Sequence, residues 1–248
     1  MYTKFISPIG LLVLWEFAIR LEWIDSRLVA PPSLVLLELW RLIQSGDLFA
    51  ALTVSLSRVV AGFLIAVVVG VALGALMARV RAIEVVFDPL IELLRPVSPL
   101  ALFPLFILWF GIGEASKVFI IAFACSPPII LNTYAGVRGI DPTFFKASRS
   151  LGASPWEVMH TIVLRGSMPN IFTGLRIAWG IALIVIVAAE MIGAVRGMGY
   201  MVLESQQTFR IPRLFGSIVV IGLMGFVTDL GFRYLKRRMM PWYRESSE

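Results

Sequence analysis

Residues 59–78 read VVAGFLIAVVVGVALGALMA, a stretch of 20 consecutive positions without one charged side chain. A helix needs about 20 apolar residues to cross the hydrocarbon layer of a membrane, so this stretch is long enough to span it. The whole chain of 248 residues has the same character, with 58% hydrophobic and 15% charged residues. Soluble domains are about 45–50% apolar and about 25% charged. Because a soluble core could not bury this excess, the composition excludes soluble enzymes and disordered chains.

Five further segments are apolar enough to be candidate spans: residues 5–19, 96–113, 118–137, 170–189 and 214–228. Three prolines in 96–113 predict either a kink or a short surface helix ahead of it that includes Glu92 and Arg95. No segment alternates apolar and polar residues in the manner of a membrane β-barrel. The sequence therefore predicts an all-α fold, a polytopic membrane bundle of about six transmembrane helices that forms one domain over residues 1–248.

Basic residues between the spans indicate how the chain is oriented. The formal net charge is +6, and cations between apolar runs indicate loops on the cytoplasmic face of a lipid membrane, not a nucleic-acid groove. Placing the amino terminus inside puts more Lys and Arg on the inner side, including the cluster Lys236-Arg237-Arg238. We expect a multi-pass protein with both termini in the cytoplasm, surrounded by membrane lipid and without a nucleic-acid partner.

The polar connection of residues 138–169 is much longer than a turn between neighbouring helices requires. Asp141, followed by a proline, is typical of a helix start, and Gly152 is typical of the left-handed residue that ends a helix. Ser154 and Glu157 then form the pattern of a capping box that starts a second helix. The segment predicts a compact knob of two short helices joined at Gly152.

A spaced motif runs through this knob. Lys146-Ala147-Ser148 is followed by Gly152 and then by Ile162-Val163-Leu164. The order and spacing resemble the motif Glu-Ala-Ala, three residues, Gly, nine residues, Ile, any residue, Leu-Pro, which marks the permease subunits of bacterial ABC importers. Lys146 stands where Glu is usual and Arg165 where Pro is usual.

The resemblance extends over nearly the whole chain and is to the branch that imports sulfonates, taurine, nitrate and related anions. It is carried by residues 88–92, 95–97, 108–113, 131–137, 174–178, 188–191, 236–238 and 241–242. It implies a type I ABC importer permease fold in the bacterial cytoplasmic (inner) membrane, with residues 138–169 as the segment that couples to an ATPase. The coupling residues it implies are Lys146, Ala147, Ser148, Arg149, Gly152, Ala153, Trp156, Ile162 and Leu164.

The same resemblance implies the partners. They are two ABC ATPase subunits, a second permease copy in a homodimer, and an extracytoplasmic solute-binding protein. The chain itself is expected to be no enzyme and to hold no cofactor, with ATP and Mg bound by the ATPase. None of its four lysines follows a glycine, so the sequence contains no Walker A motif.

Taurine or another small sulfonate is the expected solute. Nitrate, bicarbonate and a thiamine precursor remain alternatives within the family. Arg176 and Glu190 are the charges most deeply embedded in a predicted span, although both lie near the ends of their segment, and intramembrane charges are functional candidates by default. We expect both on the translocation pathway, while Asp229 and Arg233, spaced i and i+4, are expected to pair with each other.

The sequence gives little indication of a metal site, a reactive cysteine or a nucleotide site. Cys125 lies in an apolar run and is expected to be a buried hydrophobe, and His160 has no companion at ligand spacing, so no metal site is predicted. Gly197-Met198-Gly199 is followed by Val202 where a dinucleotide fingerprint needs glycine. An ion-coupled secondary transporter is the main alternative, with Glu190 as its coupling carboxylate.

Overall fold

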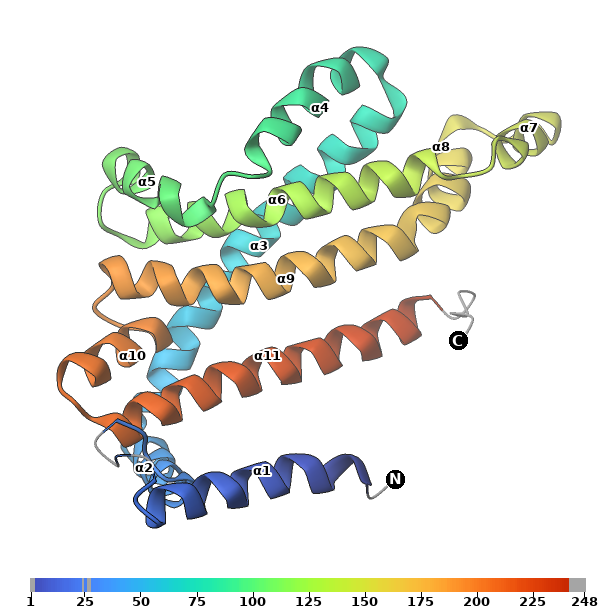
Figure 1. Ribbon diagram of the computed structural model, residues 1–248. Helices are drawn as coiled ribbons and strands as arrows, with labels where there is room; N and C mark the ends of the chain where they lie inside the picture. Colours follow the sequence, from blue (N-terminus) through green and yellow to red (C-terminus); the bar gives the residue numbers. More distant parts are fainter. Residues whose placement is uncertain (1–2, 24, 26–27, 241–248) are drawn as a thin grey trace. The chain divides into compact units, whose positions relative to one another are not determined.

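The computed structural model describes residues 3–23, 25 and 28–240, and every regular element in that part is a helix (Figure 1). The first half holds α1 (Thr3–Arg20), α2 (Pro32–Ser45), α3 (Asp47–Arg79), α4 (Arg81–Leu94) and α5 (Phe103–Phe110), the last preceded by a 3-10 turn. The second half holds α6 (Glu114–Arg138), α7 (Pro142–Ser150), α8 (Pro155–Glu157), α9 (Arg165–Gly193), α10 (Met198–Gln207) and α11 (Ile211–Met239). Pro241 and Trp242 lie outside the described residues. The all-α prediction is confirmed.

Four described helices are long and apolar enough to cross a membrane: Asp47–Arg79, Glu114–Arg138, Pro155–Gly193 and Ile211–Met239. A fifth crossing is possible if Arg81–Leu94 and Pro99–Phe110, which meet at 92°, form one broken span. The helix predicted ahead of residues 96–113 is therefore present as α4, and Arg95 follows its last residue. The expected count of six is not reached among the described helices, because the 18 residues of α1 include three charges, Lys4, Glu16 and Arg20.

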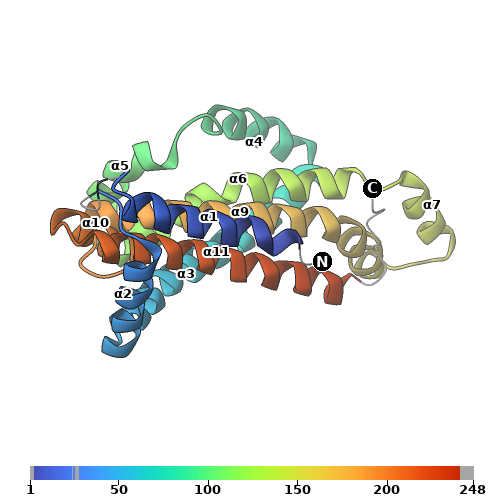
Figure 2. The ribbon, with the colours of Figure 1, turned by 60° about the horizontal axis from the view of Figure 1, so that its bottom comes forward.

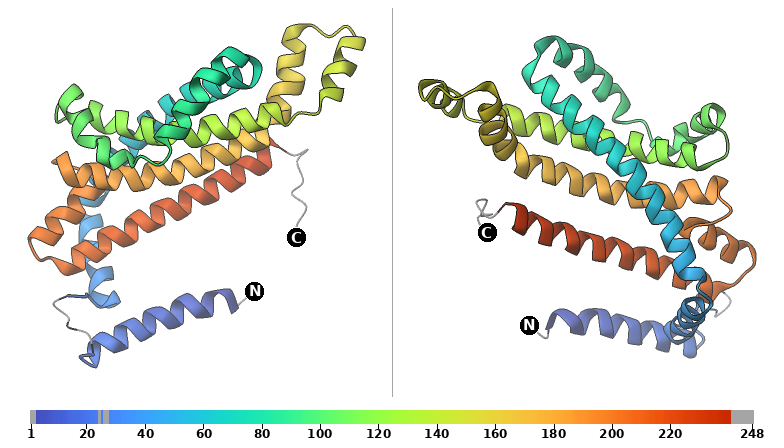
Figure 3. Two further views of the ribbon diagram at one scale, coloured as in Figure 1. Left: turned by 45° about the horizontal axis from the view of Figure 1, so that its top comes forward. Right: turned by 180° about the vertical axis from the view of Figure 1, so that it is seen from behind.

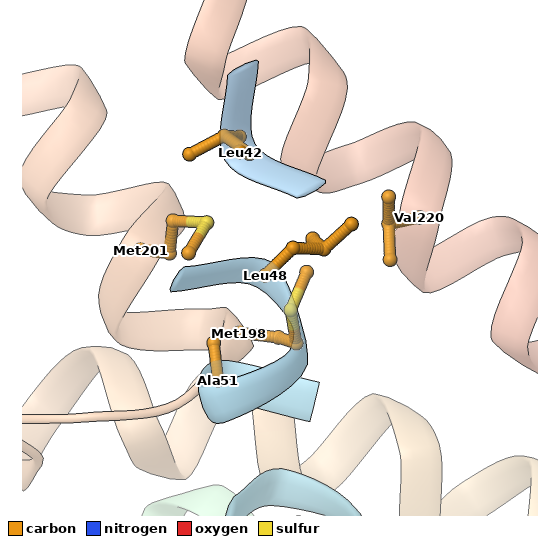
Figure 4. Close-up of a cluster of buried hydrophobic side chains, with 6 residues drawn as sticks. All are labelled: Leu42, Leu48, Ala51, Met198, Met201 and Val220. Carbon is orange, nitrogen blue, oxygen red and sulfur yellow. The ribbon is translucent and has the colours of Figure 1, made fainter. Parts of the chain in front are cut away.

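The chain divides into two compact units, and the first comprises Met1–Ser57 and Val187–Met224. Figure 4 shows its hydrophobic cluster, in which Leu42 of α2 and Leu48 of α3 face Met198 and Met201 of α10. Val220 of α11 completes one side of this cluster. The short helix α10 is therefore held by apolar packing along one face, because Met198 and Met201 are both buried.

The second unit comprises Arg58–Ile186 and Gly225–Glu248. Within it α6 and α9 run side by side, and residues 58–79 of α3 cross α6 (Figures 1 and 3). The crossing is close because Gly70 and Gly74 of α3 lie against Ile129 and Thr133 of α6, where an added Cβ would come within 2.8 Å. Small residues permit such close approach between membrane helices. The glycine pair thus packs within one subunit.

Candidate functional site

Residues 138–169 form a projection at one end of α6 and α9 (Figure 2). Its first arm is α7, which starts at Pro142, and the side chain of Asp141 accepts a hydrogen bond of 2.8 Å from the Thr143 amide. This bond to the helix start lowers the pKa of the Asp141 carboxyl below its ordinary value, because the bond favours the ionised form. The predicted helix cap is confirmed.

Gly152 ends the first arm in the left-handed conformation, with φ +69°. The amide of Ala153 reaches back to the Ser148 carbonyl at 3.0 Å, which closes the last turn. Apart from Gly152 and its two chain neighbours, no described residue has an atom within 4 Å of the position that a Cβ of Gly152 would occupy, so backbone conformation alone favours glycine there.

Ser154 and Glu157 start the second arm through a complete capping box. The Glu157 carboxylate accepts from the Ser154 amide at 2.7 Å, and the Glu157 amide donates to the Ser154 hydroxyl at 3.3 Å. The second helix is not short, contrary to expectation. It continues through the wider turns of Val158–Leu164 into α9, since no glycine or proline interrupts those seven residues.

The two arms lie side by side in Figure 3. Both arms carry large apolar side chains that are exposed. Phe144 and Leu151 on the first arm are 60% and 86% exposed, and Trp156 on the second is 71% exposed. We call these three residues the knob face. In a segment that is otherwise polar, such exposure indicates a surface that another molecule covers.

The residues expected to couple to the ATPase differ in how far they are exposed. Ser148 is buried and its hydroxyl donates to the Phe145 carbonyl at 3.0 Å, so it holds the first arm together. Ala153 and Ile162 are half-buried. The remaining expected residues are exposed: Lys146, Ala147, Arg149, Gly152, Trp156 and Leu164.

Glu190 lies in the first unit and is completely buried. Its carboxylate accepts hydrogen bonds from the Ser55 hydroxyl at 2.8 Å and from the Gly199 amide at 2.9 Å. The Ser55 oxygen in turn accepts from the Met198 amide at 2.8 Å. Both amides belong to the first turn of α10, where a carboxylate is favourable because the helix dipole is positive there. Glu190 therefore anchors the start of α10.

Two glycines make room for this anchor. A Cβ on Gly197, whose φ is +131°, would stand 2.4 Å from the Glu190 carboxylate. A Cβ on Gly199 would stand 2.2 Å from the Val187 carbonyl oxygen. The sequence signal for this arrangement is Gly-Met-Gly after an apolar helix that contains an acidic residue near its end. From the sequence, these glycines were compared only with a dinucleotide-binding fingerprint. Ser55 was missed, because nothing local marks it.

Arg176 lies in the second unit, where it binds Asp229 of α11. Asp229 is also the residue that was predicted to pair with Arg233. The Nε of Arg176 donates to Asp229 at 2.6 Å, while the Nε of Arg233 donates to the other carboxylate oxygen at 2.8 Å. The predicted Asp229–Arg233 pair is thus confirmed. Arg176 and Glu190 lie in different units, and each has its own set of partners.

A cavity of about 400 Å³ adjoins this charged group. Its lining combines three cations, one carboxylate and two aromatic rings with three uncharged residues of α9. In that order they are Arg176, Arg233, Lys236, Asp229, Phe172, Phe232, Thr173, Ile177 and Gly180. Within the described ranges, no group of three His, Cys, Asp or Glu side chains is arranged to hold a metal ion.

Residues 66–241 match a family described as binding-protein-dependent transport system inner membrane component. The taurine transport system permease protein TauC of Escherichia coli (strain K12) is 37% identical over 240 residues, covering 95% of this chain and 87% of that protein. The putative aliphatic sulfonates transport permease protein SsuC of Bacillus subtilis (strain 168) is 33% identical over 235 residues, covering 95% of this chain and 85% of that protein. In fold, the chain resembles the MetNI methionine ABC transporter in its inward-facing form, with TM-score 0.62 and 16% identity over 80% of this chain and 96% of that one.

Proposed function

The chain belongs to the family of binding-protein-dependent transport system inner membrane components, and on that premise we propose that it forms the pathway for a small sulfonate. Membership makes it a permease subunit of an ATP-driven importer and not an enzyme. It is a multi-pass protein of the inner membrane. The family and fold predicted from the sequence are confirmed by the match and by the likeness to an ABC transporter.

Such a permease works with a separate ATPase and with a solute-binding protein. In our proposal the assembly has two ATPase subunits, which bind ATP and Mg, and two copies of this chain as a homodimer. Residues 1–248 act as one permease domain, and both termini lie in the cytoplasm. The Lys236-Arg237-Arg238 cluster at the end of α11 supports that orientation, because cytoplasmic ends favour Lys and Arg.

Residues 138–169 are proposed to be the segment that docks on the ATPase. The observation that carries this role is the knob face, since Phe144, Leu151 and Trp156 expose apolar area on a rigidly capped projection. Covering apolar surface stabilises a complex by about 25 cal/mol per Å² removed from water. Lys146 and Arg149 stand on the same arm and would meet acidic side chains of the partner.

Closure of the ATPase pair would then move the two arms as one lever. The capping box and the turn at Gly152 make the arms stiff, so displacement at the knob face is transmitted to α9, into which the second arm continues. Coupling of this kind is a free energy shared between the ATP site and the transport pathway.

The solute is proposed to be taurine or a related sulfonate, by analogy with the relatives named above. Arg176 is proposed to meet the anionic group on the pathway. Glu190 is proposed to act on the pathway indirectly, through the position of α10. Nitrate, bicarbonate and a thiamine precursor are the alternatives that a transport assay must separate.

Native mass spectrometry of the tagged chain, extracted gently from its host membrane, tests the assembly. Recovery of two copies with two ATPase subunits is the expected result. Taurine-dependent ATP hydrolysis, after addition of the binding protein, would then identify the solute. Recovery as a free monomer under conditions that preserve a known ABC complex would contradict the proposal and favour an ion-coupled carrier.

A further inference from the structure

We infer that the cavity between α9 and α11 is a binding site for a tetrahedral oxyanion, a sulfonate or phosphate group carried on an alkyl chain. The inference rests on the proposed function only in the choice of a sulfonate as one probe. The site itself is formed by described residues of one compact unit.

Charge is the first argument. Arg176 and Arg233 line the cavity together with a single carboxylate, Asp229, so two guanidinium groups share one negative charge. An excess of positive charge beside a membrane-crossing helix is unfavourable unless an anion balances it. The cavity therefore attracts a negatively charged group.

The arrangement of Arg176 and Arg233 around Asp229 also favours an oxyanion. Asp229 receives the Nε of Arg176 on one oxygen and the Nε of Arg233 on the other. Among the described residues, neither guanidinium donates a further hydrogen bond from its Nη atoms. Both planar groups are thus held in place by one carboxylate while their outer N–H donors remain for a ligand. A tetrahedral oxyanion accepts from such paired donors better than a halide does.

Shape is the third argument. Phe172 and Phe232, with ring centroids 5.9 Å apart, supply an apolar part of the lining next to the cations. Binding sites for small molecules commonly combine an apolar lining with a few convergent polar groups, in volumes of about 300–1,000 Å³. A cavity of about 400 Å³ with this lining accommodates an oxyanion together with part of its alkyl chain.

Two sources present this chemistry, namely a transported aliphatic sulfonate and the phosphate of an anionic phospholipid. Gly180 allows the site to be closed, because nothing lies within 4 Å of an added Cβ and the residue lines the cavity. Gly231 of α11 has equally open surroundings and does not line the cavity, so Gly231→Leu is the matched control for Gly180→Leu.

The test uses the purified full-length chain with its ATPase in detergent. One arm measures the thermal midpoint with ethanesulfonate against chloride at equal ionic strength. The other arm uses native mass spectrometry to count retained phosphatidylglycerol against phosphatidylcholine. We expect one arm at least to show binding in the parent chain, reduced at least fivefold in Arg233→Gln and Gly180→Leu and unchanged in Gly231→Leu.

A response to ethanesulfonate alone identifies the solute as the source, and retention of phosphatidylglycerol alone identifies lipid. Binding in neither arm overturns the inference, as does binding that Gly180→Leu and Arg233→Gln leave intact. Copurification of the ATPase is scored separately. Its loss in the parent chain would remove the importer proposal without affecting the oxyanion site, and loss of binding with the ATPase retained would remove only the site.

Discussion

The Ser55 hydroxyl donates to the Glu190 carboxylate at 2.8 Å across 135 positions of sequence. Both side chains are shielded from solvent, with exposed fractions of 1% and 0%. Through them the first two amides of α10 are bonded to α3 and α9. A buried polar group that is fully bonded specifies one arrangement, and loss of one member leaves others unsatisfied.

Ser55→Ala should destabilise the protein by about 1–3 kcal/mol, because the buried Met198 amide loses its acceptor. The matched control is Ser57→Ala, two positions along α3, where the serine is exposed and bonds only to the Val54 carbonyl. Thermal unfolding in detergent, followed by loss of the monodisperse peak, measures the difference. Equal midpoints for the two variants would show that the Ser55 bond contributes nothing.

Gly197→Ala should destabilise more, by about 2 kcal/mol or above, since it adds a strained backbone to a clash with a buried carboxylate. Gly222→Ala is the comparison, because that helical glycine has open surroundings and its replacement should gain up to about 1 kcal/mol. The same unfolding assay reads both. A Gly197→Ala protein as stable as the parent would contradict the close fit around Glu190.

Gly152→Val should weaken both ATPase binding and uptake, because a β-branched residue at φ +69° costs about 1–2 kcal/mol and distorts the turn between the arms. Gly152→Asn should retain most of both, since asparagine tolerates the left-handed region. Gly152→Pro should abolish transport while the bundle remains inserted. Uptake of labelled taurine and copurification of the ATPase measure these effects, and unchanged uptake in Gly152→Pro would refute the coupling role.

Leu151→Asp should abolish copurification of the ATPase while the free energy of unfolding changes by less than about 0.5 kcal/mol, because the side chain is 86% exposed. Phe209→Asp, between α10 and α11, alters a residue that is 82% exposed and lies outside the knob face. That control should keep the ATPase. Equal retention by both variants would mean that the knob face is not the docking surface.

Asp141 makes the order of α7 depend on pH. Its pKa is lowered in the folded protein by the bond from Thr143, so the cap is fully present above the ordinary value of about 4. It is lost as the pH falls through the lowered value. Amide exchange in residues 142–150, corrected for the intrinsic rate, should therefore increase below about pH 4. Asp141→Asn, which keeps an acceptor and does not titrate in this range, should remove this dependence.

Local features of the chain were predictable because they depend on residues two to four positions apart. The caps at Asp141 and Ser154 and the left-handed Gly152 are such features, and all three are present. The Asp229–Arg233 pair spans one helical turn and was predictable for the same reason. One local expectation was wrong, because the helix that starts at Pro155 continues into α9.

What the sequence determined by itself is the membrane class, the helical fold and the family, since all three depend on apolar length and on residues at fixed spacing. Only the tertiary structure decided which distant groups meet, namely Ser55 with Glu190 and Arg176 with Asp229. It also decided the 92° angle between α4 and the helical segment Pro99–Phe110. Such partners are chosen by how helices pack, and packing depends on the shapes of whole faces. A single charge in an apolar run therefore predicts that a polar or charged partner exists. Which residue is that partner is determined by the folded chain.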